Sequence, residues 1–425
     1  MTVRVLALID GEHYAPVVRE ALEEIPHEVV GALLVGGTEK LQGEDEYGVP
    51  LASDFDDAIE RFEPDLAVDL SDEPVLGPRE RFRLASRFLA RGVAYEGADF
   101  SLRLPEYEPF DIPSIAVIGT GKRLGKTAVT GYVARLLSND HDLVVVSMGR
   151  GGPTEPQVAD VRPTVDDLLE LSRSGAHAAS DYLETAALSG VPTIGCRRCG
   201  GGLAGVPWTS NVSEGMQVAL GREPELVIFD GSGAAIPPVA TRKRILVASA
   251  QQPAELVVGY LNAYRILVSD LVVLTMAEEG TDHRGLAEAI REVKEVPVVA
   301  TVLRPRPVEP IASKHVAFFT TAEPSAADRL ERYLIEEHGA AEVVVSCNLS
   351  RRDELRRDLE SAKADVYLVE IKAAAIDVVC EAARETGTEL VFADNDVVPL
   401  EGQPSLDDEL RALADVARAE PEPVA

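Results

Sequence analysis

The sequence predicts a multidomain α/β protein, and three observations support this fold class. The chain has 425 residues, which is more than a single ordinary hydrophobic core holds. Apolar runs of strand length alternate with segments of helical period, as in parallel sheets joined by crossover helices. Two proline-dense stretches, at residues 102–114 and 303–315, divide the chain into three parts.

The composition is that of an acidic, folded protein. Hydrophobic residues make up 46% of the chain, and 41 Lys and Arg against 72 Asp and Glu give a net charge of −31. Such a surface repels nucleic acid and anionic membranes unless a local basic patch overrides it, so we expect neither as a partner. No apolar run approaches the roughly 20 residues of a membrane helix, and the N-terminus lacks the layout of a signal peptide. The four cysteines are too few for a disulfide framework, so we expect a cytoplasmic protein.

Residues 1–104 are predicted to form a Rossmann-like α/β domain. Apolar runs such as VRVLALID and EVVGALLVGG alternate there with helical segments such as FDDAIERFEP. The first strand is followed by IDGEHYAP and not by G-x-G-x-x-G, so no dinucleotide is indicated. Asp10 and His13 lie at the carboxyl end of that strand, where α/β folds bind ligands, and are candidate substrate-binding residues. The alternative is an acidic turn that caps a helix.

Two further α/β units are predicted, a central unit at 112–304 and a C-terminal unit at 312–400. Strands of the central unit are expected at SIAVIG, HDLVVVSMG, PELVIFDGSG, RILVAS, SDLVVLTMA and VPVVATVL. In the C-terminal unit the strands are expected at VAFFTTA, AEVVVSC, ADVYLVEI and TELVFADN, and they alternate with helices. Lys372 is expected at a helix start. The stretch LRPRPVEPIASKH is expected to be a junction, and residues 401–425 a short helix with an acidic tail.

The segment AVIGTGKRLGKTAV, residues 116–129, predicts a P-loop and hence a bound nucleotide. The motif G-x-x-x-x-G-K-[ST] is matched at Gly125, Lys126 and Thr127, while Thr120 takes the place of its first glycine. Lys126 would contact the β- and γ-phosphates, and the Thr127 hydroxyl would ligate Mg²⁺. The alternative is a glycine-rich turn. The predicted nucleotide-binding residues are Gly119, Thr120, Gly121, Lys122, Arg123, Leu124, Gly125, Lys126, Thr127 and Ala128.

Two other strand ends carry candidate metal and anion ligands. ELVIFDGSGAAIPP places Asp230 at a strand end before a glycine turn, so Asp230 is the candidate Walker B residue that orders the metal ion. SMGRGGPTEP places Arg150, Gly151 and Gly152 in a glycine-rich loop, which next to the P-loop strand would offer donors to an anion. Glu155 in the same loop is a candidate metal ligand. A structural turn is the alternative at both places.

The segment GCRRCGGGLAG has two main interpretations. Cys196 and Cys199 form a C-x-x-C pair, which is half of a zinc site and needs further ligands from elsewhere or from a second subunit. A redox pair is disfavoured because the motif does not open a thioredoxin-like first helix. A flexible, cationic substrate loop fits the glycines and arginines better. Its predicted substrate-binding residues are Arg197, Arg198, Gly200 and Gly201.

Five further basic residues occur in two short stretches, and their clustering in so acidic a chain requires an explanation. They are Arg242, Lys243, Arg244, Arg304 and Arg306. A phosphate-rich ligand is one explanation, and solubility of strand edges is the other.

Seven motifs in this order resemble the cyclic 2,3-diphosphoglycerate synthetase family. They are GTGKRLGKTAV, SMGRGGPTEP, GCRRCGGGLAG, FDGSGAAIPPV, ASAQQPAELVVGYLNAYR, SDLVVLTMAEE and LRPRPVEP. GTGKRLGKT also resembles the GT-x-x-x-x-GKT loop of dethiobiotin synthetase, and FDGSG its E-G-A-G strand end. The resemblance implies a homodimer and ATP-dependent closure of a phosphoanhydride between the two phosphates of 2,3-diphosphoglycerate.

For this reaction the candidate residues divide into two groups. Lys126, Thr127 and Asp230 with Mg²⁺ would manage transfer of the γ-phosphoryl group, with Lys122 as an extra cation in the loop. Arg150, Arg197 and Arg198 would gather the substrate phosphates. The predicted catalytic residues are Lys126, Asp230, Arg150 and Lys122.

Two rival functions use the same P-loop. One is a ligase similar to dethiobiotin synthetase that acts on another acid. The other is a nucleotide switch or metal-delivery GTPase, with CRRC as half of a metal site between subunits. Guanine-binding proteins usually carry an N/T-K-x-D motif, and SDLVVLTMAEEG lacks its Lys-x-Asp, which favours ATP.

Overall fold

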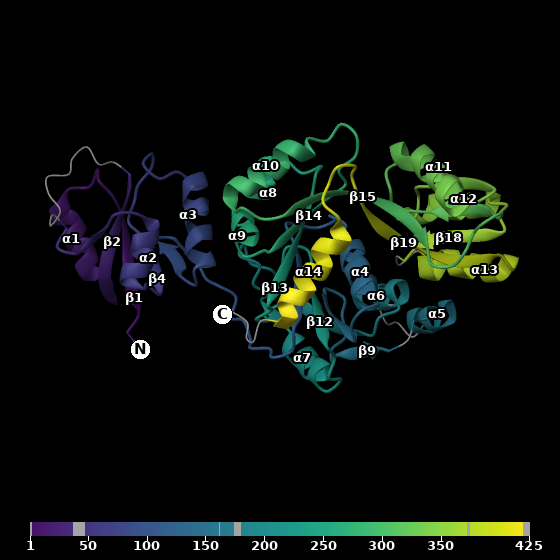
Figure 1. Cartoon of the computed structure of the whole chain (residues 1–425), viewed down its shortest axis with the longest axis horizontal. Helices are drawn as coiled ribbons and strands as arrows, with labels where there is room; N and C mark the ends of the chain where they lie inside the picture. Colours follow the sequence, from purple (N-terminus) through teal and green to yellow (C-terminus); the bar gives the residue numbers. More distant parts are fainter. Residues whose placement is uncertain (1, 37–46, 161, 174–179, 372–374, 420–425) are drawn as a thin grey trace.

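The computed structural model describes residues 2–36, 47–160, 162–173, 180–371 and 375–419, and Figure 1 shows three parts in a row. Strands and helices alternate throughout, which confirms the α/β class. The N-terminal part has its own sheet, whereas the other two parts share one large sheet. Lys372 lies outside the described residues. Among the described residues, no helix combines the length and apolar character that a membrane span needs.

The N-terminal unit is a six-stranded sheet in the order β3-β2-β1-β4-β5-β6. This is the order of a doubly wound sheet, so the Rossmann-like prediction is confirmed. Alternate residues of β1 face opposite sides: Leu6 and Leu8 pack with α2 and α3, and Ala7 and Ile9 pack with α1. Its elements are β1 (Arg4–Asp10), α1 (Ala15–Glu24), β2 (Glu28–Gly36), β3 (Leu51–Ala52), α2 (Phe55–Phe62), β4 (Leu66–Asp69), α3 (Pro78–Ala90), β5 (Ala94–Gly97) and β6 (Phe100–Leu102).

The central unit is a parallel sheet in the order β10-β8-β12-β7-β13-β14-β15. Its strands are β7 (Ser114–Gly119), β8 (Leu143–Gly149), β9 (Gln157–Ala159), β10 (Thr193–Cys199), β11 (Thr209–Ser210), β12 (Leu226–Asp230), β13 (Lys243–Ser249), β14 (Leu271–Thr275) and β15 (Val298–Pro307). β12 pairs with both β7 and β8. The loop after β8 was expected next to the P-loop strand β7, and this is wrong because the strands of a doubly wound sheet do not follow chain order.

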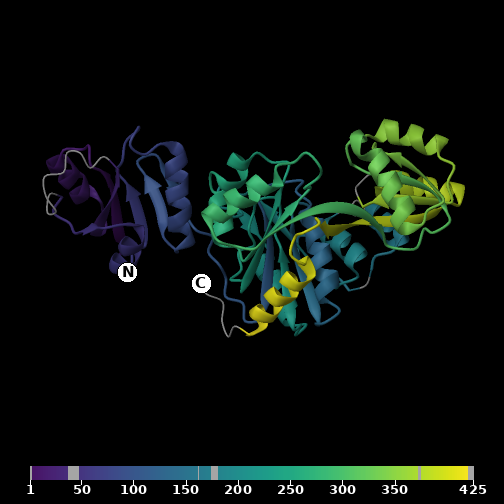
Figure 2. The ribbon, with the colours of Figure 1, turned by 45° about the horizontal axis from the view of Figure 1, so that its top comes forward.

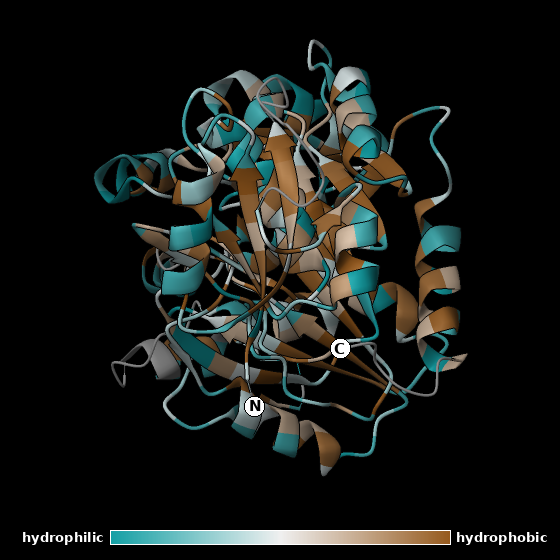
Figure 3. Ribbon diagram, turned by 90° about the vertical axis from the view of Figure 1, so that its left-hand side faces the viewer, coloured by the Kyte–Doolittle hydropathy of each residue, from teal (hydrophilic) through white to brown (hydrophobic). Residues whose placement is uncertain are grey.

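The helices of the central unit cover both faces of its sheet, so the strands β7, β8 and β12 are buried throughout. Figure 3 shows the apolar strands inside and the polar sides of the helices outside. This burial explains why the strands read as continuous apolar runs in the sequence. The helices are α4 (Lys126–Leu137), α5 (Val165–Arg173), α6 (Asp181–Ser189), α7 (Val212–Leu220), α8 (Ala254–Val258), α9 (Asn262–Leu267) and α10 (His283–Val293).

The C-terminal unit continues the same sheet in the order β15-β19-β18-β16-β17. Its elements are β16 (His315–Phe319), α11 (Ala327–His338), β17 (Glu342–Ser346), α12 (Arg352–Ser361), β18 (Val366–Glu370), α13 (Cys380–Thr386) and β19 (Glu389–Pro399). β15 pairs with β14 only through residues 298–300, and from 301 to 307 it pairs with β19. The expected junction at 303–315 thus begins within β15, the strand that runs from the central unit into the C-terminal unit. Pro305 and Pro307 fit there because, among the described strands, none pairs with the other side of residues 301–307.

Four charged side chains fasten this two-stranded ribbon to α4, the helix that follows the P-loop. Arg135 of α4 pairs with Asp394 and, at 3.1 Å, with Asp396, both on β19. Arg306 of β15 pairs with the same two carboxylates at 3.1 and 3.3 Å. The Asp394 side chain is 3% exposed, so water does not replace its partners. The network explains Arg306 without a phosphate ligand.

Two other basic residues also have protein partners. Arg304 forms two hydrogen bonds with Glu278, at 2.7 and 3.1 Å. Arg242 donates to the carbonyl oxygen of Ala417 at 2.9 Å, close to the end of α14 (Leu406–Ala419). Both residues therefore stabilise the fold.

Helix α14 packs on the central unit, as Figure 2 shows. Leu406, Leu410 and Ala414 are buried in the same hydrophobic cluster as residues of α4 and β7. Tyr132 of α4 donates a hydrogen bond to Asp407 at 2.5 Å. The short helix expected within residues 401–425 is thus confirmed, and it completes the core of the central unit.

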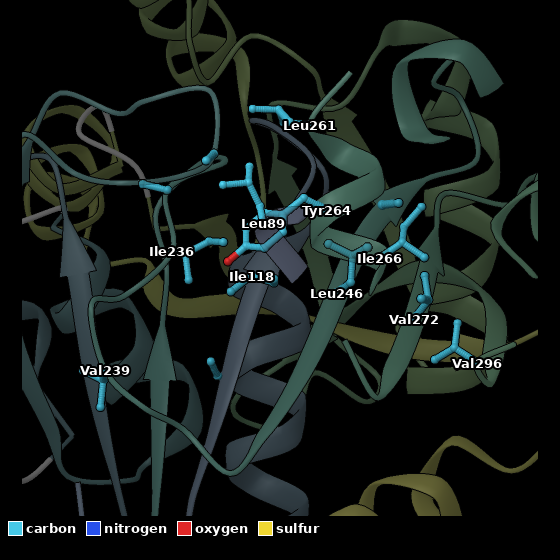
Figure 4. Close-up of a cluster of buried hydrophobic side chains, with 14 of the residues drawn as sticks. Leu89, Ile118, Ile236, Val239, Leu246, Leu261, Tyr264, Ile266, Val272 and Val296 are labelled. Atoms are coloured by element: carbon cyan, nitrogen blue, oxygen red, sulfur yellow. The ribbon is translucent and has the colours of Figure 1, made fainter. Parts of the chain in front are cut away.

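The N-terminal and central units share a hydrophobic contact between α3 and α9. Figure 4 shows Leu89 of the first unit beside Leu261 and Tyr264 of the second, and all three belong to one buried cluster. The Phe82 and Tyr260 rings meet edge to face at 5.6 Å, and the Ser86 hydroxyl donates to the Tyr260 carbonyl at 3.2 Å. The interface is therefore a packed one.

We expect Asp394→Ala to destabilise the protein by about 3–5 kcal/mol, because it leaves two largely buried guanidinium groups without their shared carboxylate. Urea unfolding followed by circular dichroism measures this difference. Asp353→Ala is the control, since it breaks only an exposed pair with Arg356. It should change stability by less than about 0.5 kcal/mol. Equal effects of the two substitutions would contradict the assigned role of the network.

Candidate active site

The P-loop connects β7 to α4, and glycine is required where it enters the helix. Gly125 has a φ of 77°, and a Cβ atom there would lie 2.6 Å from Leu303 Cδ1 of β15. The Thr120 hydroxyl donates to Gln252 Oε1 at 2.9 Å. Contacts with Leu303 and Gln252 therefore hold the loop in place. The N-terminus of α4 points at the loop, and a helix N-terminus in this position binds phosphate.

A buried ion pair lies directly beneath this loop. The Lys126 ammonium donates to the Asp230 carboxylate and to the carbonyl oxygen of Gly231. Thr130 of α4 donates to the same carboxylate at 3.0 Å, and the Asp230 side chain is 2% exposed. Burial raises the pKa of Asp230, while the Lys126 ammonium opposes this shift. Asp230 ends β12, the direct neighbour of β7, so lysine and carboxylate meet where phosphates and their metal ion bind in P-loop proteins.

The glycine turn after β12 brings two further cations to this place. Gly233 has a φ of 59°, and a Cβ atom there would lie 3.5 Å from Lys122 Cγ and 3.7 Å from Arg198 Nη2. Arg198 donates to the Ser232 carbonyl at 2.7 Å and also to the Gly200 carbonyl. The structure thus brings together Lys122 of the P-loop, Arg198 of β10 and the turn that follows Asp230.

Two more charged residues lie within electrostatic reach of Arg198. Burial lowers the pKa of Arg198, and the charge of Arg150 lowers it further. The Asp181 carboxylate opposes this shift and also raises the pKa of Asp230. Sequence reasoning missed Asp181, which begins α6 without any motif. A helix start placed after the β8 loop was the one available signal.

The loop after β8 is held against β10. A Cβ atom on Gly152 would collide with the Cys196 carbonyl, so glycine allows the two segments to touch. Arg197 donates to Thr154 Oγ1 at 3.1 Å and thereby ties the loop to the strand. Gly151 and Glu155 are exposed. Within the described part of the chain Glu155 forms no ion pair.

The C-x-x-C segment lies in strand β10, and the loop begins only at Gly200. The expectation of a flexible loop is therefore wrong for its first half. Side chains alternate along a strand, so Cys196 and Cys199 point to opposite faces; Cys196 is buried against α7, and Cys199 is exposed. In the described residues no three His, Cys, Asp or Glu side chains gather as a metal site. The two thiols of one chain therefore do not point at a common ion, which disfavours the zinc interpretation.

Asp10 and His13 form a separate group in the N-terminal unit. The buried Asp10 carboxylate accepts from the His13 ring at 2.5 Å and from the Asp72 N–H at 2.7 Å. Burial opposes ionisation, but these hydrogen bonds hold the pKa of Asp10 below its usual value. Asp10 ends β1, and Asp72 follows β4, so the group lies where the strand order of the sheet reverses. Among the described residues, no hydrogen bond or ion pair joins it to the P-loop.

Glu278 follows β14 at the place of the Asp in an N/T-K-x-D motif. Its carboxylate is occupied by Arg304, which contacts both of its oxygens. A carboxylate held in this way is not available to read a guanine base.

Three family models match the chain, and together they cover nearly all of it. They are described as the N-terminal domain (residues 4–103), the P-loop domain (114–305) and the C-terminal domain (307–396) of cyclic 2,3-diphosphoglycerate synthetase. The protein of that name from Rubrobacter xylanophilus is 52% identical over 93% of this chain and 94% of its own. That of Methanothermus fervidus is 40% identical over 98% of each chain. Among solved structures, LpxK from Aquifex aeolicus in complex with ATP covers 72% of this chain and 90% of its own, with 12% identity and a TM-score of 0.40.

We expect iodoacetamide at pH 8 to label Cys199 quickly and Cys196 slowly. Burial raises the pKa of the Cys196 thiol to about 12, so little reactive thiolate exists at that pH, whereas Cys199 is exposed. Peptide mass spectrometry after short labelling measures both rates. Equal protection of the two thiols that a chelator relieves would restore the zinc interpretation.

Proposed function

The chain belongs to the cyclic 2,3-diphosphoglycerate synthetase family, and we propose that it closes a phosphoanhydride within 2,3-diphosphoglycerate, consuming ATP and releasing ADP and phosphate. The observation that carries this proposal is the cluster of Lys122, Lys126 and Arg198 around the buried Asp230. In a chain of net charge −31 such a cation cluster suits substrates with several phosphates. The family descriptions and relatives support the same reaction.

The nucleotide is proposed to bind along the P-loop, residues 119–128. Backbone N–H groups and the start of α4 would receive its phosphates, and Lys126 would exchange its contact with Asp230 for the β- and γ-phosphate oxygens. The Thr127 hydroxyl and the Asp230 carboxylate are hard oxygen donors that fit Mg²⁺. When bound, Mg²⁺ would neutralise phosphate charge. Asp181 is a better candidate than the exposed Glu155 for a supporting water contact, because its charge acts on Asp230.

The reaction is proposed to proceed in two displacements. An oxygen of one substrate phosphate attacks the γ-phosphorus, and the bond to the β-phosphate oxygen breaks to release ADP. An oxygen of the second substrate phosphate then attacks the phosphorus of the first, and inorganic phosphate leaves as the ring closes. Arg150, Arg197 and Arg198 would hold the two phosphates together against their repulsion, and Lys122 would assist. Glycines 151, 152, 200 and 201 would allow the loops to approach them.

Further roles are proposed for the remaining parts. Asp10 and His13 lie at the switch point of the N-terminal sheet, which supports a ligand contact there. Residues 1–104 and 312–400 are proposed as domains that flank the catalytic domain at 112–304. The free cysteines among the described residues support a cytoplasmic protein. The family resemblance supports a homodimer, and the net charge argues against a nucleic-acid partner.

We expect Lys126→Ala to lower the rate of ADP release with 2,3-diphosphoglycerate and Mg²⁺ by at least about 100-fold, because it removes the cation nearest to the transferring group. A coupled spectrophotometric assay measures this rate, and circular dichroism checks the fold. Lys363→Ala, at an exposed lysine of the C-terminal unit, is the matched control and should keep full activity. Full activity of a folded Lys126→Ala protein would remove the P-loop from the mechanism.

We expect Arg198→Gln to raise the KM for 2,3-diphosphoglycerate at least about tenfold, and Arg197→Gln to raise it less. Arg198 contacts the turn after Asp230, whereas Arg197 contacts the loop after β8. One bidentate phosphate contact accounts for a tenfold change. Steady-state kinetics with saturating ATP gives both values, and the reverse order would contradict the proposed assignment.

A further inference from the structure

Arg265, on α9, is a buried arginine whose charge is not matched by a carboxylate. It is 2% exposed, and among the described residues no ion pair joins it to Asp or Glu. Burial lowers the pKa of its guanidinium to about 10, so it remains charged at neutral pH. Burying such a group is costly unless its donors are used. The groups that accept hydrogen bonds from Arg265 therefore indicate which segments of the chain it stabilises.

Those acceptors come from separate segments of the chain. Arg265 Nε and Nη2 donate to the Ala234 carbonyl at 3.2 and 2.6 Å, and Nη1 donates to the Leu203 carbonyl at 3.2 Å. Nη1 also donates to Leu261 and Asn262 at the start of its own helix, at 2.9 and 3.2 Å. Ala234 lies in the glycine turn after β12 and Leu203 in the glycine loop after β10. One side chain thus bridges two loops from different strands.

The same two loops carry the carbonyl groups that hold the cations of the site. Gly231, in the turn after β12, accepts from Lys126, and Ser232 accepts from Arg198. Gly200, in the loop after β10, also accepts from Arg198. A shift of either loop would therefore move these carbonyl groups and change the position of the Arg198 guanidinium. Misplacement by about 1 Å in a site of this kind costs up to about 100-fold in rate.

The P-loop itself depends less on this arginine. Asn262, a partner of Arg265, donates to the Thr120 carbonyl at 3.4 Å, a long contact. Thr120 is held more firmly by Gln252, at 2.9 Å. Lys126 keeps its ion pair with the Asp230 carboxylate even if the turn after β12 shifts. Loss of the arginine fork would consequently disturb the substrate side of the site more than the nucleotide side.

We propose that Arg265 is a positioning residue: it clamps the glycine turn after β12 to the glycine loop after β10 and so sets the place of Arg198 for the phosphorylated substrate. This proposal rests on the proposed role of Arg198. Arg265 acts through the backbone carbonyl groups and does not touch substrate.

The test uses Arg265→Lys, which keeps the charge but cannot reach both loops with a planar fork. We expect its KM for 2,3-diphosphoglycerate to rise at least tenfold and its KM for ATP to change less than threefold. Amide hydrogen exchange at residues 200–205 and 231–236 should become faster. If Arg265→Lys folds poorly, Arg265→Gln takes its place in the test. Its shorter amide should shift the same quantities in the same direction.

Arg4→Lys is the matched control. The Arg4 side chain donates to the backbone carbonyls of Phe62 and Glu63, within the N-terminal unit. Its substitution should leave both KM values and the exchange of the two loops unchanged. Unchanged loop exchange in a folded Arg265→Lys protein, or equal rises in both KM values, would overturn the proposal. The exchange measurement needs no turnover, so it tests the role of Arg265 independently of the proposed reaction. If the proposed reaction itself is wrong, the unaltered protein will form no cyclic product.

Discussion

The ion pair between Lys126 and Asp230 is the interaction on which the rest of the site depends. It joins the first residue of α4 to the last residue of the neighbouring strand β12, and it is nearly excluded from water. A lysine in that position would be costly to bury alone, and so would the aspartate. Paired, they keep a cation and a carboxylate ready at the P-loop. The glycine turn after Asp230 then sets where Arg198 and Lys122 can lie, since both pass close to Gly233.

The large sheet also connects the P-loop and α4 to the C-terminal unit. Leu303 of β15 packs against the P-loop at Gly125, and Arg306 of the same strand shares two carboxylates with Arg135 of α4. The strand that leaves the central sheet therefore touches both the phosphate loop and the helix behind it. The C-terminal unit is thus fastened to the nucleotide-binding elements by buried charges as well as by strand pairing.

Local patterns made most of the fold and the centre of the site predictable. The P-loop and Asp230 were found because glycine spacing and strand ends are encoded in a few consecutive residues. Asp181 and Arg265 were not found, because each acts on residues far away in sequence and lies in no motif. The strand at Cys196–Cys199 was missed because its glycines and arginines suggested a loop. Prolines 305 and 307 suggested a junction without a strand, and the strand that runs through it was missed, since a sequence does not reveal which edge of a strand is unpaired.

If phosphoryl transfer and ring closure are coupled through the substrate, one substrate oxygen must end in the released inorganic phosphate, and its path can be followed. The unaltered protein is given ATP, Mg²⁺ and 2,3-diphosphoglycerate that carries ¹⁸O in its phosphoryl oxygens, and ³¹P NMR resolves the isotope shifts. Two successive displacements predict a cyclic product and inorganic phosphate with one ¹⁸O atom taken from the substrate. Inorganic phosphate that contains no substrate oxygen, with its fourth oxygen taken from water, would exclude transfer of the γ-phosphoryl group to the substrate.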